Sequence, residues 1–204
     1  MIVRPLRVQD AAAFRAFVER LSPASRYARF QFVVKELSPP LLRMLVEADP
    51  RSHVALAAFQ DSELVGEARY VRSDDSAEFA IAVADGWRRR GLARYLLHRL
   101  LAKARRDGLR RVEGEVLAGN AAMLAFVQQA GFQVLPHPED ERLILTRLEL
   151  YTGLRPANAS SRSAGVLRRH RGPQPQSSSL SSSPCRSSAR HVKFFGSPPL
   201  PLPL

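Results

Sequence analysis

Cysteine is almost absent from the chain: among 204 residues the only one is Cys185. A lone thiol forms no intrachain disulfide, and the residues before it hold neither a cysteine nucleophile nor a cysteine ligand for a metal. No apolar run approaches the roughly 18 residues of a membrane-spanning helix. The N-terminal segment Met1–Arg7 already contains two arginines and does not resemble a secretory signal peptide. We therefore expect a soluble, cytoplasmic protein with no membrane partner.

Acidic residues are missing from the last quarter of the chain. All 19 aspartates and glutamates lie at or before Glu149, whereas residues 152–204 contain eight lysines and arginines. The preceding part has 23 basic residues against those 19 acidic ones, a net charge of +4, although the whole chain carries +12. Residues 1–151 are thus only mildly basic, and we expect no nucleic-acid partner for them.

Residues 152–204 also differ in composition from everything before them. Residues 153–204 contain 12 serines and eight prolines without helical or strand periodicity. Such a segment cannot bury enough apolar surface to offset the entropy lost on folding, so we expect a disordered basic tail after a folded domain of residues 1–151. Three interpretations stay open: a tail that binds nucleic acid or a membrane surface, an extension without a selected function, and an out-of-frame reading of a GC-rich gene.

Apolar periodicity divides the first 151 residues into strands and helices. Strands are expected at 2–7, 53–60, 63–71, 77–83, 111–117, 132–135 and 142–150. Helices are expected to begin at Asp10, Ser22, Ser38, Leu92 and Ala121. Asp10 and the two serines are candidate N-caps, and both serines precede a proline suited to the first helical position. In the second helix we expect Tyr27 and Phe30 to face inward. The order predicts an α/β fold with a mixed central sheet of about seven strands flanked by helices.

The stretch from Val83 to Ala93 combines an incoming strand, an arginine- and glycine-containing turn and the start of a long helix. Helix N-termini present free backbone N–H groups and partial positive charge, and Arg88, Arg89 and Arg90 add full charges. The sequence therefore predicts an anion site whose natural ligand is a phosphate or pyrophosphate.

The motif Arg88-x-x-Gly91-x-Ala93 resembles the pyrophosphate-binding signature of the GNAT superfamily of N-acetyltransferases. A second block, from Asn120 to Gly131-Phe132, resembles the closing helix of that family. The resemblance extends over residues 2–150 and implies acetyl-CoA as cosubstrate, without a metal. It assigns cofactor binding to the following residues: Val83, Arg88, Arg89, Arg90, Gly91, Leu92, Ala93 and Asn120. The N–H of Val83 would polarise the thioester carbonyl; Asn120 would bond the pantetheine arm or orient the loop, and it is equally a candidate N-cap.

One branch of the family is more closely similar. The strings Arg4-Pro5-Leu6-Arg7, Arg20-Leu21-Ser22-Pro23-x-Ser25-Arg26-Tyr27-x-Arg29-Phe30 and Lys35-Glu36-Leu37-Ser38 resemble the protein lysine acetyltransferase domains that are often fused to acyl-CoA synthetase-like modules. The alternative interpretation of these strings is a well-capped pair of helices with solvated arginines.

The same resemblance suggests a general base. Glu78, on the strand at 77–83, is the candidate, and Glu115 on the next strand is the second choice; for both, a solvated strand carboxylate is the alternative. Many relatives place a tyrosine seven residues after the asparagine to protonate the leaving thiolate, but this chain has Val127 there. We expect an enzyme that moves acetyl from acetyl-CoA directly to a primary amine, with a protein lysine as the candidate acceptor. The alternative is a catalytically weak acyl-CoA-binding regulatory domain.

Overall fold

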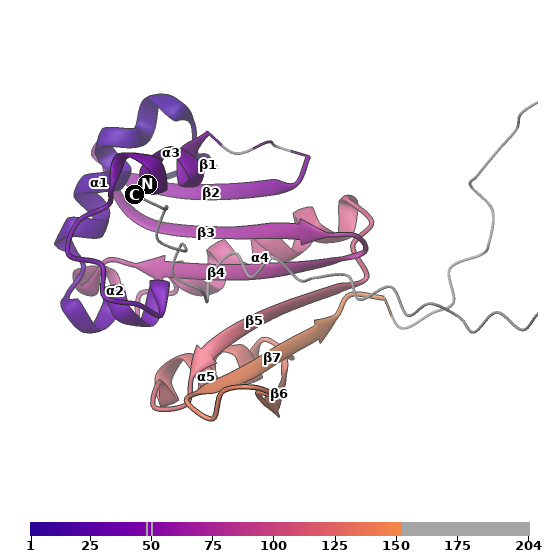
Figure 1. Cartoon of the computed structure of the whole chain (residues 1–204). Helices are drawn as coiled ribbons and strands as arrows, with labels where there is room; N and C mark the ends of the chain where they lie inside the picture. Colours follow the sequence, from indigo (N-terminus) through magenta and orange to yellow (C-terminus); the bar gives the residue numbers. More distant parts are fainter. Residues whose placement is uncertain (48, 50, 152–204) are drawn as a thin grey trace, which may run out of the picture. The chain divides into compact units, whose positions relative to one another are not determined.

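The computed structural model describes residues 1–47, 49 and 51–151, which contain one seven-stranded sheet in the order β1-β2-β3-β4-β5-β7-β6 (Figure 1). The strands are β1 Ile2–Pro5, β2 His53–Gln60, β3 Glu63–Ser73, β4 Ser76–Val83, β5 Arg111–Leu117, β6 Gln133–Pro136 and β7 Leu143–Glu149. The helices are α1 Ala11–Arg20, α2 Pro23–Phe30, α3 Pro39–Val46, α4 Leu92–Arg106 and α5 Ala121–Gln129. The predicted mixed sheet is confirmed; the expected tail, residues 152–204, lies outside the described residues.

Every pair of neighbouring strands is antiparallel except β4 and β5, which run parallel. A parallel pair needs a long crossover, and here α4 provides it. The residues of β4 alternate between the two faces of the sheet, as a strand requires. Phe79, Ile81 and Val83 pack with α4 and α5, whereas Ala82 packs with the N-terminal helices. Each face of the sheet therefore has its own apolar core.

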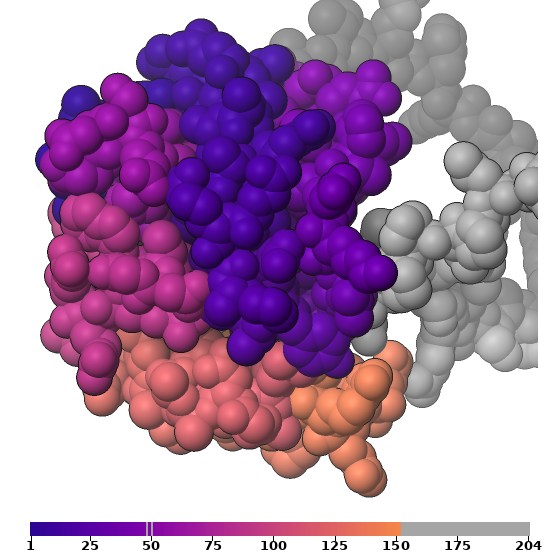
Figure 2. Space-filling view, turned by 90° about the vertical axis from the view of Figure 1, so that its left-hand side faces the viewer, coloured from indigo at the N-terminus to yellow at the C-terminus, as the bar shows by residue number. Residues whose placement is uncertain are grey.

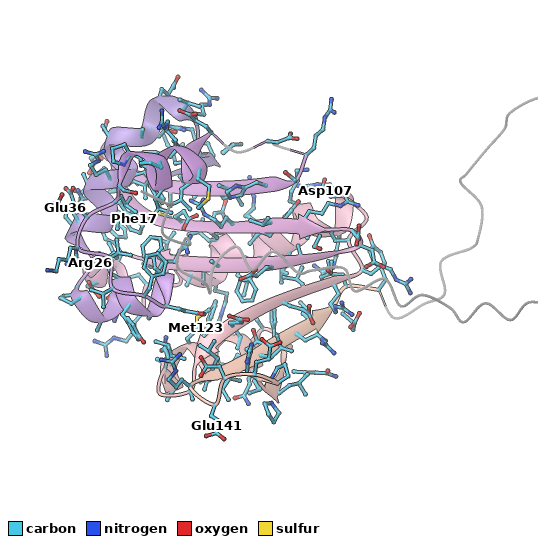
Figure 3. The ribbon with its side chains drawn as sticks, in the orientation of Figure 1. Phe17, Arg26, Glu36, Asp107, Met123 and Glu141 are labelled. Carbon is cyan, nitrogen blue, oxygen red and sulfur yellow. The ribbon has the colours of Figure 1, made fainter. Side chains whose placement is uncertain are left out.

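The N-terminal helices α1 to α3 build the core on one face. Phe14 and Phe17 of α1 are almost completely buried, and Phe17 points from its helix toward the sheet (Figure 3). Both predicted serine caps are present: Ser22 Oγ accepts from the N–H of Ser25 at 3.3 Å, and Ser38 Oγ accepts from that of Leu41 at 3.4 Å. In both helices a proline follows the cap, where its missing N–H costs no hydrogen bond.

Two local predictions need correction: Asp10 holds the N-cap position of α1 without capping it through its side chain, and Tyr27 does not face inward. Asp10 precedes α1, but its carboxylate does not cap that helix; it accepts from the Arg7 N–H at 2.8 Å and from both terminal nitrogens of Arg4 at 2.6 and 2.7 Å. A guanidinium binds a carboxylate in two places at once, which outweighs a single capping bond. Tyr27 is exposed, at 37%, while Phe30 is buried as expected. The phenol is polar at its tip and tolerates water.

Within the described residues, no helix is long and apolar enough to cross a membrane.

Candidate active site

A cleft of about 620 Å³ opens where β4 and β5 separate. The two strands pair only between Ser76–Glu78 and Arg111–Glu113, and beyond that point they diverge toward their C-terminal ends (Figure 1). The ring of Phe79 lies between them against Gly114, where a Cβ atom would come within 2.5 Å of the ring. The ring therefore leaves no room for a side chain at position 114 of β5.

Among the described residues, no strand pairs with the edge of β4 that borders this cleft beyond Glu78. The Ala84 N–H donates to Val65 on β3 at 2.9 Å. Successive residues in a strand send their backbone groups to opposite edges, so those of Val83 and Ile81 are directed toward the side of β5. Since β5 has already diverged, this edge is suited to an extended ligand with amide groups.

The turn after β4 closes one end of the cleft. Arg89 and Gly91 both have left-handed backbones, with φ of 58° and 81°. Gly91 is the N-cap of α4 and has no side chain with which to cap it, so the first N–H groups of this helix are left for another acceptor. This geometry matches the anion site predicted from the sequence.

The three arginines of the turn are placed differently. Arg88 and Arg89 line the cleft. Arg88 Nη2 donates to Ser25 Oγ at 2.6 Å and lies 2.9 Å from Asp85 Oδ1. Arg90 stacks over the ring of Trp87, 5.0 Å from its centroid, and is not among the lining residues. The other residues assigned to the cofactor, from Val83 to Asn120, all line the cleft; their role stays a prediction.

Asp85 joins the turn to helix α2. Its carboxylate accepts from the Ser22 N–H at 2.8 Å and from Ser25 Oγ at 2.7 Å, and it pairs with Arg88. Burial alone would raise the pKa of the Asp85 carboxyl, but these donors hold the pKa below its ordinary value. In the space-filling view the indigo-to-purple N-terminal helices lie against the magenta segment that carries this turn (Figure 2).

Glu78 and Glu115 line the same cleft. Glu78 lies opposite Glu113 in the register of β4 and β5, and Glu115 follows two residues later, on the same face of β5. Glu115 Oε1 is 3.1 Å from Nε2 of His137, which lies in the loop after β6. The fold thus places both predicted base candidates on one cleft.

The family scan matches the acetyltransferase (GNAT) family over residues 15–132, more than half of the chain. This chain belongs to the GNAT family of acetyltransferases. It is 36% identical to an acetyltransferase of Pseudomonas aeruginosa, over 74% of this chain and 84% of that protein. It is 30% identical to the acetyltransferase Pat of Mycolicibacterium smegmatis, over 54% of this chain but only 34% of that longer protein.

Among solved structures, the GNAT domain of PAT from S. lividans superposes with a TM-score of 0.69 at 30% identity, covering 72% of this chain and 89% of that one. The fold assignment is thereby confirmed, as is the resemblance to the branch of protein lysine acetyltransferases. GNAT enzymes use acetyl-CoA. The cleft of this GNAT domain is lined by the arginine- and glycine-containing turn and by the part of β4 that lies beyond its pairing with β5.

Asn120 and Val127 occupy two positions that the family resemblance singles out. Asn120 Oδ1 accepts from the Met123 N–H at 3.2 Å, so this asparagine caps α5 as well as lining the cleft. Val127 is completely buried in the core, beside Phe132. Among the described residues no tyrosine lines the cleft, and no group of three or more His, Cys, Asp or Glu side chains is arranged to hold a metal ion.

A buried ionic cluster supports the α2 side of the GNAT cleft. Glu67 on β3 is completely buried, pairs with Arg69 and accepts from Arg29 of α2 at 3.4 Å. Burial alone would raise the pKa of Glu67, but the two guanidiniums hold it below the ordinary value. Because removing one member would leave an uncompensated buried charge, this cluster fixes α2 on the sheet.

Sequence reasoning missed several residues at this site. Ser25 lies inside the string that carries the family resemblance, so the sequence did contain a signal that could have identified it. Gln31 and His137 had none: each is a single polar residue without a motif, and contacts between distant parts of the chain place them beside Glu115.

Proposed function

We propose that this GNAT domain transfers the acetyl group of acetyl-CoA directly to a primary amine, with a protein lysine as the acceptor. One observation carries the proposal: the anion-binding turn and the two carboxylates, Glu78 and Glu115, line one continuous cleft. The similarity to Pat and PAT supports a lysine as the acceptor.

The reaction requires a neutral amine. A lysine amine has a pKa of about 10.4, so only about one in a thousand is neutral at pH 7.4, a cost of about 4 kcal/mol. In the proposed mechanism Glu78 accepts a proton from the ammonium group, and the amine nitrogen then forms a bond to the thioester carbon. The N–H of Val83 stabilises the negative charge that develops on the carbonyl oxygen.

The leaving group is the thiolate of coenzyme A. When the carbon–sulfur bond breaks, this thiolate departs toward a cleft in which, among the described residues, no tyrosine is present to protonate it. A thiol has an ordinary pKa of about 8.5, so the thiolate is a stable leaving group near neutral pH. As the amide forms, the nitrogen gives up its second proton, which passes through water to the thiolate, and Glu78 releases the first proton to solvent. Val127 is therefore compatible with turnover.

Cofactor binding is tested by calorimetry on the full chain. We expect acetyl-CoA to bind the wild type and to lose most of its affinity in a variant with Arg88→Ala, Arg90→Ala and Gly91→Glu, which removes two charges and places a carboxylate in the anion site. A folded wild-type protein that does not bind acetyl-CoA would contradict the proposal.

Catalysis is tested on lysine-containing peptides. Glu78→Gln is expected to lower kcat by about 10²-fold or more while leaving the affinity for acetyl-CoA unchanged. Glu113→Gln is the matched control, because this carboxylate lies on β5 beside the site but pairs with Arg147 at 2.6 Å and is not among the cleft residues. Binding of acetyl-CoA without any acetyl transfer would favour the regulatory alternative.

A further inference from the structure

Glu115 and His137 form a closely packed pair where β5 borders the cleft. The Glu115 side chain is 13% exposed and that of His137 is 4% exposed, with Nε2 and Oε1 3.1 Å apart. His137 lies in the loop of residues 137–142, which Glu141 marks in Figure 3. The pair is thus almost enclosed by protein, and Glu115 faces the cleft.

Backbone hydrogen bonds determine which ring nitrogen of His137 carries the proton. The N–H groups of Glu139 and Asp140 both point at Nδ1, at 3.2 and 2.9 Å. A nitrogen that accepts two hydrogen bonds carries no proton, so the ring proton is on Nε2. His137 therefore donates to Glu115, and this bond holds the carboxylate in one orientation.

Gln31 borders the same carboxylate from the other side of the cleft. It ends α2 in a left-handed conformation, with φ of 61°, and its Nε2 donates to the backbone oxygen of Glu115 at 3.1 Å. A carbonyl oxygen only accepts, so the orientation of the Gln31 amide is settled. Its Oε1 atom is buried and has no hydrogen-bond partner among the described residues, and Gln31 is one of the residues that line the cleft. A buried acceptor without a donor is costly, which points to a donor supplied by a ligand.

Two acceptors therefore lie beside this part of the cleft: the Glu115 carboxylate and Gln31 Oε1. The cation closest in sequence, Arg29, is directed to Glu67 on β3 and shares its charge with that carboxylate. A ligand that satisfies two acceptors and a negative charge has several N–H donors and a positive charge, as a primary ammonium group does.

We propose that Glu115 and Gln31 form the receiving site for the ammonium group of the acceptor, with His137 as the positioning residue that orients Glu115. The inference rests on the proposed function, because it assigns a place to the acceptor amine. It separates two roles: Glu115 binds the charged amine, and Glu78 removes its proton.

The test uses Nα-acetyl-lysine amide and its uncharged analogue Nα-acetyl-norleucine amide as probes. Each is titrated into the full-chain protein saturated with coenzyme A, and binding is followed by NMR chemical-shift changes. We expect the lysine amide to bind the wild type and the norleucine amide to bind at least about tenfold more weakly, as loss of a hydrogen bond to a charged group predicts.

Variants then distinguish a role of His137 in orienting Glu115 from a role in folding alone. Glu115→Gln, Gln31→Leu and His137→Phe should each weaken lysine amide binding several-fold or more, whereas His137→Gln, which keeps an N–H near the place of Nε2, should bind almost as the wild type does. In turnover assays the KM for the amine should follow the same order while the KM for acetyl-CoA stays constant. Glu113→Gln is the control with the same charge change.

Three results would overturn the inference: no binding of the lysine amide by the wild type, equal binding of both probes, or unchanged lysine amide affinity in Glu115→Gln. Glu115→Gln preserves the size and shape of the side chain and is expected to fold. The inference can therefore still be tested if the His137→Phe variant does not fold. Binding in the expected order without any acetyl transfer would instead contradict the proposed function and leave the ammonium site standing.

Discussion

Gly114→Ala is the substitution for which the structure predicts the clearest effect. An added Cβ would lie 2.5 Å from Cε1 and 2.8 Å from Cδ1 of Phe79, closer than real atoms approach. The ring has little room to move, because Phe79 is 5% exposed and its centroid is 5.1 Å from that of Phe132. The strands must therefore shift, or Phe79 must leave its preferred rotamer.

The expected cost follows from overpacking in other cores. One extra methyl group in a filled core costs about 1–3 kcal/mol in free energy of unfolding. For a folded part of this size, that corresponds to a fall in Tm of about 2–12 °C. An ordinary glycine-to-alanine change in a strand would instead be neutral or slightly stabilising, because it restricts the unfolded chain.

The assay is thermal and urea-induced unfolding of the wild type and of three variants. Gly119→Ala is the control, since no atom lies within 4 Å of its added Cβ and its backbone is not left-handed. Phe79→Leu shortens the ring side chain and should relieve the clash. The double variant Phe79→Leu/Gly114→Ala should therefore be more stable than the sum of the single effects implies, by about 1 kcal/mol.

A Gly114→Ala protein whose stability lies within about 0.5 kcal/mol of the wild type would contradict the predicted clash, because ordinary surface changes have effects of that size. Additive single and double variants would also contradict it, because they would show that the Gly114 site and the Phe79 ring do not contact each other as described.

Three further predictions concern charged and titratable groups. Burial and the neighbouring guanidiniums lower the pKa of His53 to about 4; the unfolded chain, with an ordinary pKa of about 6.5, binds the extra proton, so stability should fall as the pH drops from about 6.5 to 4. Urea unfolding across this range should show the fall, and His53→Gln should flatten it; an equal slope in both proteins would contradict the assignment. Asp85→Asn should lower Tm and weaken acetyl-CoA binding in calorimetry, because it loosens the turn from α2, whereas the exposed control Asp75→Asn should change neither. Finally, ¹⁵N NMR should show a proton on Nε2 of His137, and a proton on Nδ1 alone would exclude donation to Glu115.

Much of the fold was predictable because it depends on local patterns. Alternation with a period of two marked the strands, and the Ser-Pro pairs at Ser22 and Ser38 marked helix starts that the structure confirms. Strand ends were less predictable: β3 continues to Ser73 and β4 begins at Ser76, so the expected polar loop of residues 72–76 is shorter. Pairing between strands, rather than composition, decides where a hairpin ends.

The candidate site was predictable to the extent that it is continuous in sequence. The turn around Gly91 carries its arginines and its left-handed glycine within a few residues, so the sequence alone was enough to predict an anion site there. The roles of Asp10 and Tyr27 were misjudged because each is decided by a neighbour or by exposure that local pattern does not contain.

The sequence by itself determined the order of strands and helices, the basic glycine turn and the family of this protein, since all three depend on residues close together in the chain. Only the tertiary structure decided that Gln31 and His137 meet at Glu115, across separations of 84 and 22 residues. That meeting requires β5 to diverge from β4 and α2 to be held on β3 by buried charges. These are long-range packing and electrostatic effects, and no local periodicity encodes them.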